Sequence, residues 1–168
     1  MKIIVTGHKR GIGRSIFQYF DKPFNEVIGF SLSDGYDISN ISNRIDIINE
    51  CIDADIFVNN AYNNDDSQLM LLQEIFKLWK GLDKVIINIS SRHTNSNGQY
   101  SRNKKKIDEY CEKNVYNLPK IINLKPGLVD TDRVKNIKNI KMTTQDVIDI
   151  LDFCLKSKVK VHSISFGL

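Results

Sequence analysis

The sequence predicts an α/β fold in which a doubly wound parallel sheet lies between two layers of helices, and three observations lead to this prediction. Short apolar segments alternate with longer helical ones along the chain, which is typical of βαβ units. Most of the short segments are almost continuously apolar, as strands covered on both faces should be. The first of them runs directly into a glycine-rich turn. The 168 residues, 41% apolar and 26% charged, suit one globular domain over residues 1–168.

The strands and helices are predicted in strict alternation. Six short apolar segments are the candidate strands, at residues 2–6, 26–31, 55–59, 84–89, 120–124 and 162–165. Five helical patterns lie between them, at residues 11–20, 43–52, 67–80, 100–113 and 143–156. Thr143 offers a capping residue before the last helix. Pro119 and Pro126 fit strand edges or turns rather than the interior of an element.

A glycine-rich turn follows the first strand, with the sequence Gly7-His8-Lys9-Arg10-Gly11-Ile12-Gly13. Glycines let the backbone turn tightly and approach a pyrophosphate, while the N–H groups at the start of the next helix face the anion. A strand, a glycine-rich turn and a helix in this order indicate a dinucleotide site, although the commoner spacing is Gly-x-Gly-x2-Gly. An ordinary strand-to-helix turn is the alternative.

Tyr100 and Lys104 stand four residues apart in a helical pattern, so their side chains share one helix face. Ser91 lies nine residues before Tyr100, at the end of the apolar run that begins at Val85. A nearby ammonium favours the phenolate form of a tyrosine, and a hydroxyl at the end of a neighbouring strand can hold a substrate oxygen. The alternatives are a strand-end cap, a half-buried helix residue and a solvated lysine.

The distinctive residues follow the carboxyl ends of four predicted strands. These ends carry the glycine turn, the segment Asn59-Asn60-Ala61, the pair Ser90-Ser91 and the segment 125–131. In open parallel sheets, ligands bind in the crevice outside the carboxyl ends of the strands. The order of the motifs therefore indicates one functional site at this edge of the sheet.

Taken together, the motifs resemble those of the short-chain dehydrogenase/reductase family from one end of the chain to the other. Three segments are similar to the cofactor-binding motifs of the family, namely Thr6-Gly7-x3-Gly11-Ile12-Gly13, Asp37-Ile38 and Asn59-Asn60-Ala61. In the family the motif at Asp37-Ile38 meets the adenine. After Asn59-Asn60-Ala61, Tyr62 replaces the usual glycine. The catalytic motifs are similar to Ser90-Ser91 and Tyr100-x3-Lys104, and the segment that closes over the nicotinamide is similar to Pro126-Gly127-x-Val129-x-Thr131.

The resemblance implies a Rossmann-type fold and hydride transfer between NAD(P)(H) and a small carbonyl or alcohol substrate. Tyr100 would be the general acid or base, Lys104 would favour its phenolate form and hold the nicotinamide ribose, and Ser91 would bind the substrate oxygen. The resemblance implies that the cofactor is bound by Gly7, Arg10, Gly11, Ile12, Gly13, Ser31, Asp37, Ile38, Asn59, Asn60, Ala61, Tyr100, Lys104, Pro126, Gly127, Val129 and Thr131.

NADP is the favoured cofactor and NAD the second choice. Family members that prefer NAD carry an acidic residue at the end of the second strand, where this chain has Ser31. Arg10 directly precedes Gly11, and a guanidinium suits a 2′-phosphate. Leu32 stands where an arginine often supports NADP, and Asp34 lies close by in the sequence, which leaves NAD as an alternative.

The chain also departs from the family pattern. It is much shorter than typical members, Asn64 falls in a predicted loop and takes no catalytic role, and the segment that forms a substrate lid is reduced to residues 132–142. A cofactor-binding regulatory protein with little or no catalytic activity is therefore the alternative function. The apolar run from Leu69 to Leu82 covers more than one helix face, which indicates either a homodimer or homotetramer contact or a deeply buried helix.

Composition argues against several other classes of protein. The net charge is +4, and basic residues gather at 104–106 and 133–141, but no recognition helix or aromatic pattern accompanies them, so solvated surface is preferred to a nucleic-acid site. Cys51, Cys111 and Cys154 are too widely spaced for a disulfide framework or a metal site. No apolar run suits a membrane span, and a reducing, cytoplasmic setting is expected.

Overall fold

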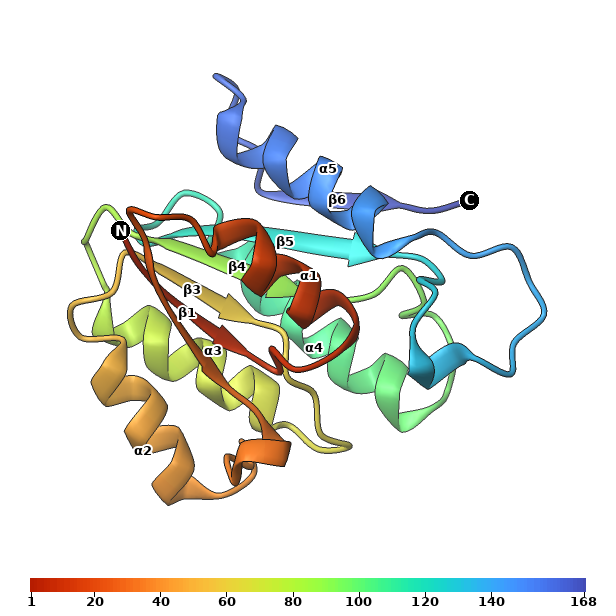
Figure 1. The fold of residues 1–168 in the computed structure, drawn as a ribbon, viewed down its shortest axis with the longest axis horizontal. Helices are drawn as coiled ribbons and strands as arrows, with labels where there is room; N and C mark the ends of the chain where they lie inside the picture. The colour runs from red at the N-terminus through yellow and green to blue at the C-terminus, as the bar shows by residue number, and fades with distance from the viewer.

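The computed structural model describes all residues, 1–168, and has at its centre a parallel sheet with strand order β2-β1-β3-β4-β5-β6 (Figure 1). The strands are β1 (Lys2–Thr6), β2 (Glu26–Phe30), β3 (Ile56–Asn59), β4 (Val85–Ile89), β5 (Lys120–Pro126) and β6 (Ser163–Phe166). Every neighbouring pair of strands is parallel. The predicted α/β fold with a doubly wound parallel sheet is confirmed.

Helices cover both faces of this sheet (Figure 1). They are α1 (Gly11–Phe20), α2 (Ile41–Glu50), α3 (Ser67–Leu78), α4 (Gln99–Lys113) and α5 (Thr144–Lys156). Helix α1 packs beside α5 on one face, while α3 packs between α2 and α4 on the other. The predicted strands and helices are all present, and their ends agree within two residues. Two short 3-10 helices, η1 (Leu32–Asp34) and η2 (Asp132–Val134), were not predicted.

Alternate residues of each strand supply the two halves of the core. Ile4, Phe57 and Ile86 are buried in the cluster under α2, α3 and α4. Ile3 and Ile87 are buried in the cluster under α1 and α5. Because successive side chains of a strand point to opposite faces, a strand covered on both sides must be apolar at nearly every position. This explains the continuous apolar runs of the sequence.

Burial within the chain accounts for most of the apolar surplus around α3. Leu71, Leu72, Ile75 and Trp79 have no exposed surface and pack into the core. The hydrophobic residues of this run that remain exposed are Met70, Leu78 and Leu82. The surplus therefore does not require a contact with a second copy of the chain.

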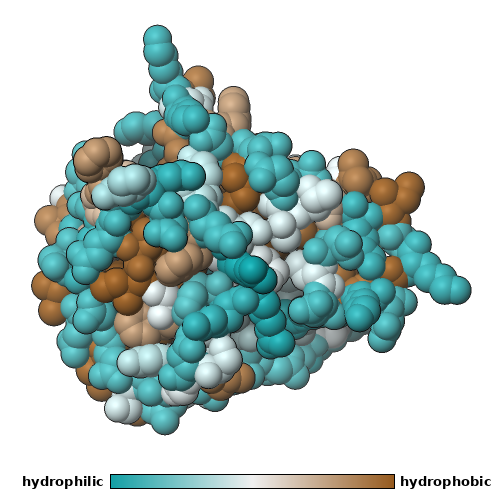
Figure 2. All heavy atoms as spheres, viewed as in Figure 1, coloured by the Kyte–Doolittle hydropathy of each residue, from teal (hydrophilic) through white to brown (hydrophobic).

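The surface seen in Figure 2 is largely hydrophilic, with hydrophobic residues in separate groups. The exposed hydrophobic side chains come from distant parts of the chain, with Phe24 and Tyr116 the most exposed. None of the helices combines the length and the apolar character that crossing a membrane requires.

The crevice for a ligand opens between β1 and β3. The chain leaves the carboxyl end of β1 towards α1 on one face of the sheet, and it leaves the carboxyl end of β3 towards α3 on the other face. Neighbouring strands whose connections part in this way form the usual ligand site of an open parallel sheet. Thr6 and Asn59, the last residues of the two strands, therefore mark the centre of the crevice.

Three buried asparagines form a row across the middle of the sheet. Asn59, Asn88 and Asn123 stand opposite one another on β3, β4 and β5. Each amide nitrogen donates to the next amide oxygen, at 2.9 Å from Asn59 and 2.7 Å from Asn88. The row ends on α4, where Asn123 Nδ2 donates to the carboxylate of Asp108 at 2.8 Å. This row joins three strands and a helix through buried polar groups.

We expect the substitution Asn88→Ala to lower the free energy of unfolding by about 2 kcal/mol or more. It leaves the amide of Asn59 and the oxygen of Asn123 without this partner, and a buried polar group without a partner costs about 1–3 kcal/mol. Urea unfolding measures the change. The exposed Asn117→Ala is the control, with an expected effect within about 0.5 kcal/mol. Equal effects of both substitutions would contradict the structural role of the row.

Candidate active site

The turn after β1 presents free backbone N–H groups to the crevice. Gly7 and Gly11 have φ angles of 71° and 54°, a region that favours glycine. Helix α1 begins at Gly11, its N-cap residue Arg10 forms no capping bond through its side chain, and its first turn has no acidic residue. The first N–H groups of a helix have no partner within the helix. This helix start therefore suits an anionic group such as a pyrophosphate.

Close packing against Gly7 and against the segment after β3 explains the third glycine of the turn. A Cβ atom on Gly13 would lie 2.2 Å from the carbonyl oxygen of Gly7 and 2.3 Å from Nδ2 of Asn60. Thr6 Oγ1 accepts hydrogen bonds of 3.0 Å from the N–H groups of both Asn60 and Ala61. Asn60 Nδ2 donates to the carbonyl oxygen of Thr6 at 3.0 Å. These contacts hold the segment after β3 against the glycine turn.

A cavity of about 480 Å³ lies over this edge of the sheet, within the usual size range of ligand pockets. Ten of the predicted cofactor-binding residues line it, namely Gly7, Arg10, Gly11, Ile12, Ser31, Asp37, Ile38, Asn60, Ala61 and Thr131. The remaining lining residues are Leu32, Tyr36, Tyr62, Asn63, Asp132 and Arg133. The glycine turn, the end of β2 and the segment after β3 thus meet at one cavity.

Asp37 lines the cavity, and hydrogen bonds hold its carboxylate in place. Its carboxylate accepts hydrogen bonds from the Ser39 N–H at 2.9 Å and from Asn63 Nδ2 at 3.3 Å. Hydrogen bonds from Ser39, and then from Asn63, hold the pKa of the Asp37 carboxyl below its usual range. The carboxylate is therefore ionised near neutral pH, and it can accept a hydrogen bond from an amino group such as that of adenine.

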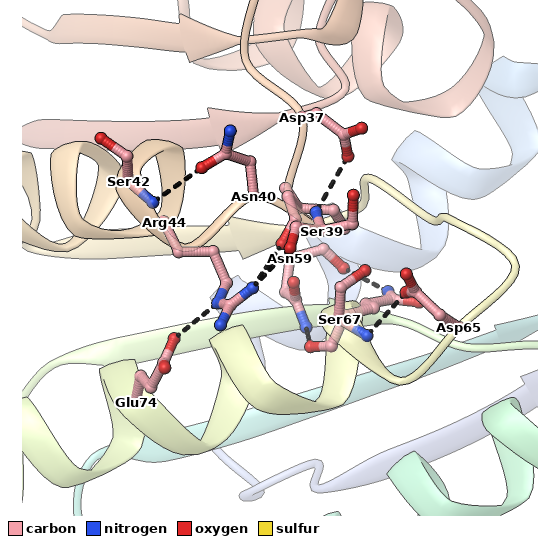
Figure 3. A network of polar contacts seen from close by, with 11 residues as sticks. Asp37, Ser39, Asn40, Ser42, Arg44, Asn59, Asp65, Ser67 and Glu74 are labelled. Carbon is pink, nitrogen blue, oxygen red and sulfur yellow. Dashed lines mark hydrogen bonds and ion pairs between the residues drawn. The ribbon is translucent and has the colours of Figure 1, made fainter.

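A buried arginine supports the segment that carries Asp37 (Figure 3). Arg44 of α2 donates from Nη1 to the carbonyl oxygen of Ile38 at 2.9 Å. Its Nε lies 3.2 Å from the carboxylate of Glu74 on α3. Figure 3 shows how the guanidinium lies between α3 and this segment. Two helices are therefore used to position Asp37 and Ile38.

The end of β2 has no free carboxylate facing the cavity. Ser31 and Leu32 line this part of it, together with Arg10 from the glycine turn. Asp34 is bound to Lys9, whose Nζ lies 3.2 Å from the carboxylate, and its other oxygen lies 3.7 Å from His8. Arg10 forms no ion pair. A guanidinium without a partner can bind a phosphate.

Lys104 is deeply buried in α4. Its Nζ donates to Oε1 of Gln68 and to the carbonyl oxygen of Ile89, both at 2.7 Å. Burial, assisted by the positive charge of Arg133 and opposed by Asp108, lowers the pKa of Lys104 to about 7. A neutral amine has two N–H donors, which match the two acceptors. Both the charged and the neutral form are therefore accessible near neutral pH.

Tyr100 lies beside Lys104, as the four-residue spacing predicts. Lys104 Nζ is 5.6 Å from the centroid of the Tyr100 ring, which is half-buried, and the Tyr100 hydroxyl has no hydrogen-bond partner. Ser91 is buried, and its Oγ accepts a hydrogen bond from the His93 N–H at 3.1 Å. Ser91 is two residues beyond Ile89, whose carbonyl binds Lys104, so all three predicted catalytic residues belong to the same edge of the sheet.

Several predicted cofactor-binding residues lie outside the cavity lining. Asn59 belongs to the buried row of asparagines, and Gly13 is packed under the glycine turn. Pro126 is buried at the end of β5, and Val129 is buried against Met142 and Val147. Gly127 lines a second cavity of about 430 Å³, with Arg92, His93, Leu128, Ile137, Asn139, Ile140 and Leu168.

Three residues of the site were not assigned roles from the sequence. Gln68 donates to the carbonyl oxygens of Asn59 and Ile89 and accepts from Lys104, but it sits in an apolar helical pattern without any motif. Tyr62 and Arg133 both line the cavity and both contact Tyr100. Of these three residues, only Tyr62 was noticeable in the sequence, because it stands where the family usually has a glycine. No group of three His, Cys, Asp or Glu residues could hold a metal ion.

Comparison with known proteins gives matches at the level of structure. No protein-family model and no curated protein sequence matches the chain. A 4-hydroxyisoleucine dehydrogenase complexed with NADH matches 99% of this chain and 96% of its own, with a TM-score of 0.77 and 16% identity. A small-chain dehydrogenase in complex with NADPH matches 100% of this chain and 96% of its own, with a TM-score of 0.79 and 13% identity.

A third solved structure is a short-chain dehydrogenase/reductase of the glucose/ribitol dehydrogenase type from Brucella melitensis. It matches 99% of this chain and 94% of its own, with a TM-score of 0.80 and 14% identity. At such low identity the agreement concerns the fold, and it extends over almost the whole length of both chains. The chain has the Rossmann-type fold of the short-chain dehydrogenases/reductases.

Proposed function

We propose that the chain is an NAD(P)-dependent oxidoreductase of the short-chain type, which acts as a single domain on a small carbonyl or alcohol substrate. The observation that carries this proposal is the cavity lined by the glycine turn, at the same sheet edge as Ser91, Tyr100 and Lys104. The solved neighbours with NADH and NADPH support a nicotinamide nucleotide as the ligand.

The lining of the cavity fits the adenosine and pyrophosphate parts of such a nucleotide. The free N–H groups at the start of α1 would bind the pyrophosphate, and Asp37 with Ile38 would meet the adenine. Asn60, Ala61 and Thr131 would line the path towards Tyr100. When bound, the nicotinamide ring supplies or accepts a hydride.

The chain's own residues would handle the proton and the developing charge. Tyr100 would exchange a proton with the substrate oxygen, and Ser91 would hydrogen-bond to the same oxygen. In its charged form Lys104 favours the phenolate of Tyr100, because an opposite charge nearby stabilises the ionised phenol. Its carbonyl partners on Gln68 and Ile89 hold it in this position.

NADP is the better candidate, and NAD is the alternative. Arg10 faces the cavity beside Ser31 and has no carboxylate partner, so it can bind a 2′-phosphate. Asp34, the nearest acidic residue after β2, is bound to Lys9. These contacts lower the repulsion that a phosphorylated ribose would meet.

A cofactor-binding regulatory protein is the second candidate function. The observation in its favour is that Tyr62 and Arg133 line the cavity and contact the ring of Tyr100, whereas Tyr100, Lys104 and Ser91 do not line it. Such a protein would bind the nucleotide without turning it over. A screen of NADPH and NADH oxidation with aldehydes, ketones and sugar nucleotides distinguishes the two candidates.

We expect Arg10→Ala to weaken NADPH binding about tenfold and to change NADH binding much less. The reason is that a hydrogen bond to a charged group contributes about 1.5–3 kcal/mol, and only NADPH carries the 2′-phosphate. Calorimetric titration with both nucleotides measures the effect. Arg14→Ala, which removes an exposed arginine of α1 outside the cavity, is the control. An equal loss for both nucleotides would contradict the assigned role.

We expect Tyr100→Phe to lower the rate of hydride transfer by about 10²–10⁴-fold, since that is the typical contribution of a general acid or base. The nucleotide dissociation constant should change by less than about threefold, because the ring remains in place. The measurement is NADPH oxidation with the best substrate of the screen, together with calorimetry. A variant that keeps the wild-type rate would exclude Tyr100 as the acid or base.

Lys104 should make the stability of the fold depend on pH. Its folded pKa of about 7 lies below the ordinary value of 10.5, so the unfolded chain holds more protons between these values. The free energy of unfolding therefore rises with pH over this window, by up to about 1.4 kcal/mol per pH unit. Below pH 7 both states hold the proton, and the cost of burying it is fully present.

Urea unfolding at pH 7 and pH 9 tests this dependence. The wild-type chain should gain stability relative to Lys104→Met as the pH rises, because methionine has no proton to release. Parallel pH profiles of the two proteins would show that Lys104 titrates normally in the folded chain.

A further inference from the structure

Two side chains from different segments line the cavity and also contact the ring of Tyr100. Tyr62 belongs to the loop between β3 and α3, and Arg133 belongs to η2. Both line the cavity, whereas Ser91, Tyr100 and Lys104 do not. A ligand in the cavity therefore meets Tyr62 and Arg133 before it can reach Tyr100.

The two side chains are packed against the catalytic pair and against each other. The rings of Tyr62 and Tyr100 meet edge to face, with centroids 5.0 Å apart and an angle of 81° between the planes. The Arg133 guanidinium carbon lies 5.0 Å from the centroid of Tyr62 and 5.1 Å from that of Tyr100. Lys104 Nζ lies 5.0 Å from the Tyr62 ring. Tyr62 therefore occupies space beside Lys104 that a larger ligand would need.

The cavity has the polar groups for an adenine nucleotide with a free terminal phosphate. Asp37 and Asn63 line it together with the glycine turn and Arg10, and Asn63 donates a hydrogen bond to Asp37. Arg133 lines the cavity and forms no ion pair. A terminal phosphate carries more charge than the diester phosphates of a dinucleotide, so it gains more from such an arginine.

We propose that Tyr62 and Arg133 form a gate, and that the closed gate makes the cavity a site for adenosine diphosphate rather than for a whole dinucleotide. The proposal rests on the proposed function in one respect, namely that the cavity binds adenine nucleotides. The gate must open, by displacement of the Tyr62 ring, before a nicotinamide can approach Tyr100. Arg133 is the residue that recognises the terminal phosphate in the closed form.

The test is calorimetric titration of the full chain with ADP and with NADPH. We expect the wild-type chain to bind ADP at least as tightly as NADPH. Tyr62→Gly should tighten NADPH binding at least tenfold and change ADP binding by less than threefold, because it removes the ring and leaves the phosphate site. Arg133→Ala should weaken ADP binding at least tenfold.

Two further substitutions serve as controls. Tyr62→Phe keeps the ring and should retain the wild-type ratio of the two dissociation constants. Tyr116→Gly removes a fully exposed tyrosine far from the cavity lining, and it should leave both constants unchanged. If Tyr62→Gly does not fold, Tyr62→Ala can be used to measure the same ratio of the NADPH and ADP dissociation constants. The ratio for the wild-type chain can be measured without any variant.

The outcomes separate this proposal from the proposed function. NADPH binding at least tenfold tighter than ADP binding to the wild-type chain, with the ratio unchanged in Tyr62→Gly, would overturn the gate and leave the oxidoreductase proposal intact. Failure of both nucleotides to bind would overturn both proposals. Tight ADP binding with a tenfold gain for NADPH in Tyr62→Gly would support the gate even if no substrate were turned over.

Discussion

The hydrogen bonds around Gln68 and Lys104 connect the main parts of the structure. Gln68 Nε2 donates to the carbonyl oxygens at the ends of β3 and β4, and its Oε1 accepts from Lys104 on α4. The side chains of Gln68 and Lys104 are buried, so their polar groups must find partners inside the protein. Removing either side chain would leave the polar groups of the other without this hydrogen bond, in a place where water cannot replace it. Two strand ends and two helices are thereby held in one arrangement.

This arrangement has direct consequences for the site. Lys104 cannot reach into open solvent, because its amine is bound to Gln68 and Ile89, and Tyr100 is carried beside it one helical turn earlier. The row formed by Asn59, Asn88 and Asn123 extends the same buried polar system across the sheet to Asp108. The carboxyl edge of the sheet is therefore held together by buried hydrogen bonds beside Tyr100 and Lys104. Tyr62 and Arg133 lie on the connecting segments at this edge, Tyr62 after β3 and Arg133 in η2.

Much of the fold could be predicted because it depends on local patterns. Continuous apolar runs identified β1, β3, β4 and β5, since a strand covered on both faces has little room for polar residues. The glycine turn and the spacing of Tyr100 and Lys104 were readable for the same reason, because each depends on a few consecutive residues. The bonds of Gln68 could not be predicted, since its partners lie 9 to 36 residues away in the chain.

The sequence by itself determined the order of strands and helices, the helix start that suits an anion, and the shared face of Tyr100 and Lys104. These features follow from the periodicity of side chains and the conformational freedom of glycine, which act over short distances along the chain. Only the tertiary structure decided that Lys104 is buried and hydrogen-bonded to Gln68 and Ile89. The same holds for the Asn59 side chain, which joins the buried row of asparagines. The tertiary structure also decided that Tyr62 and Arg133 line the cavity and contact Tyr100, because such contacts depend on which distant segments pack together.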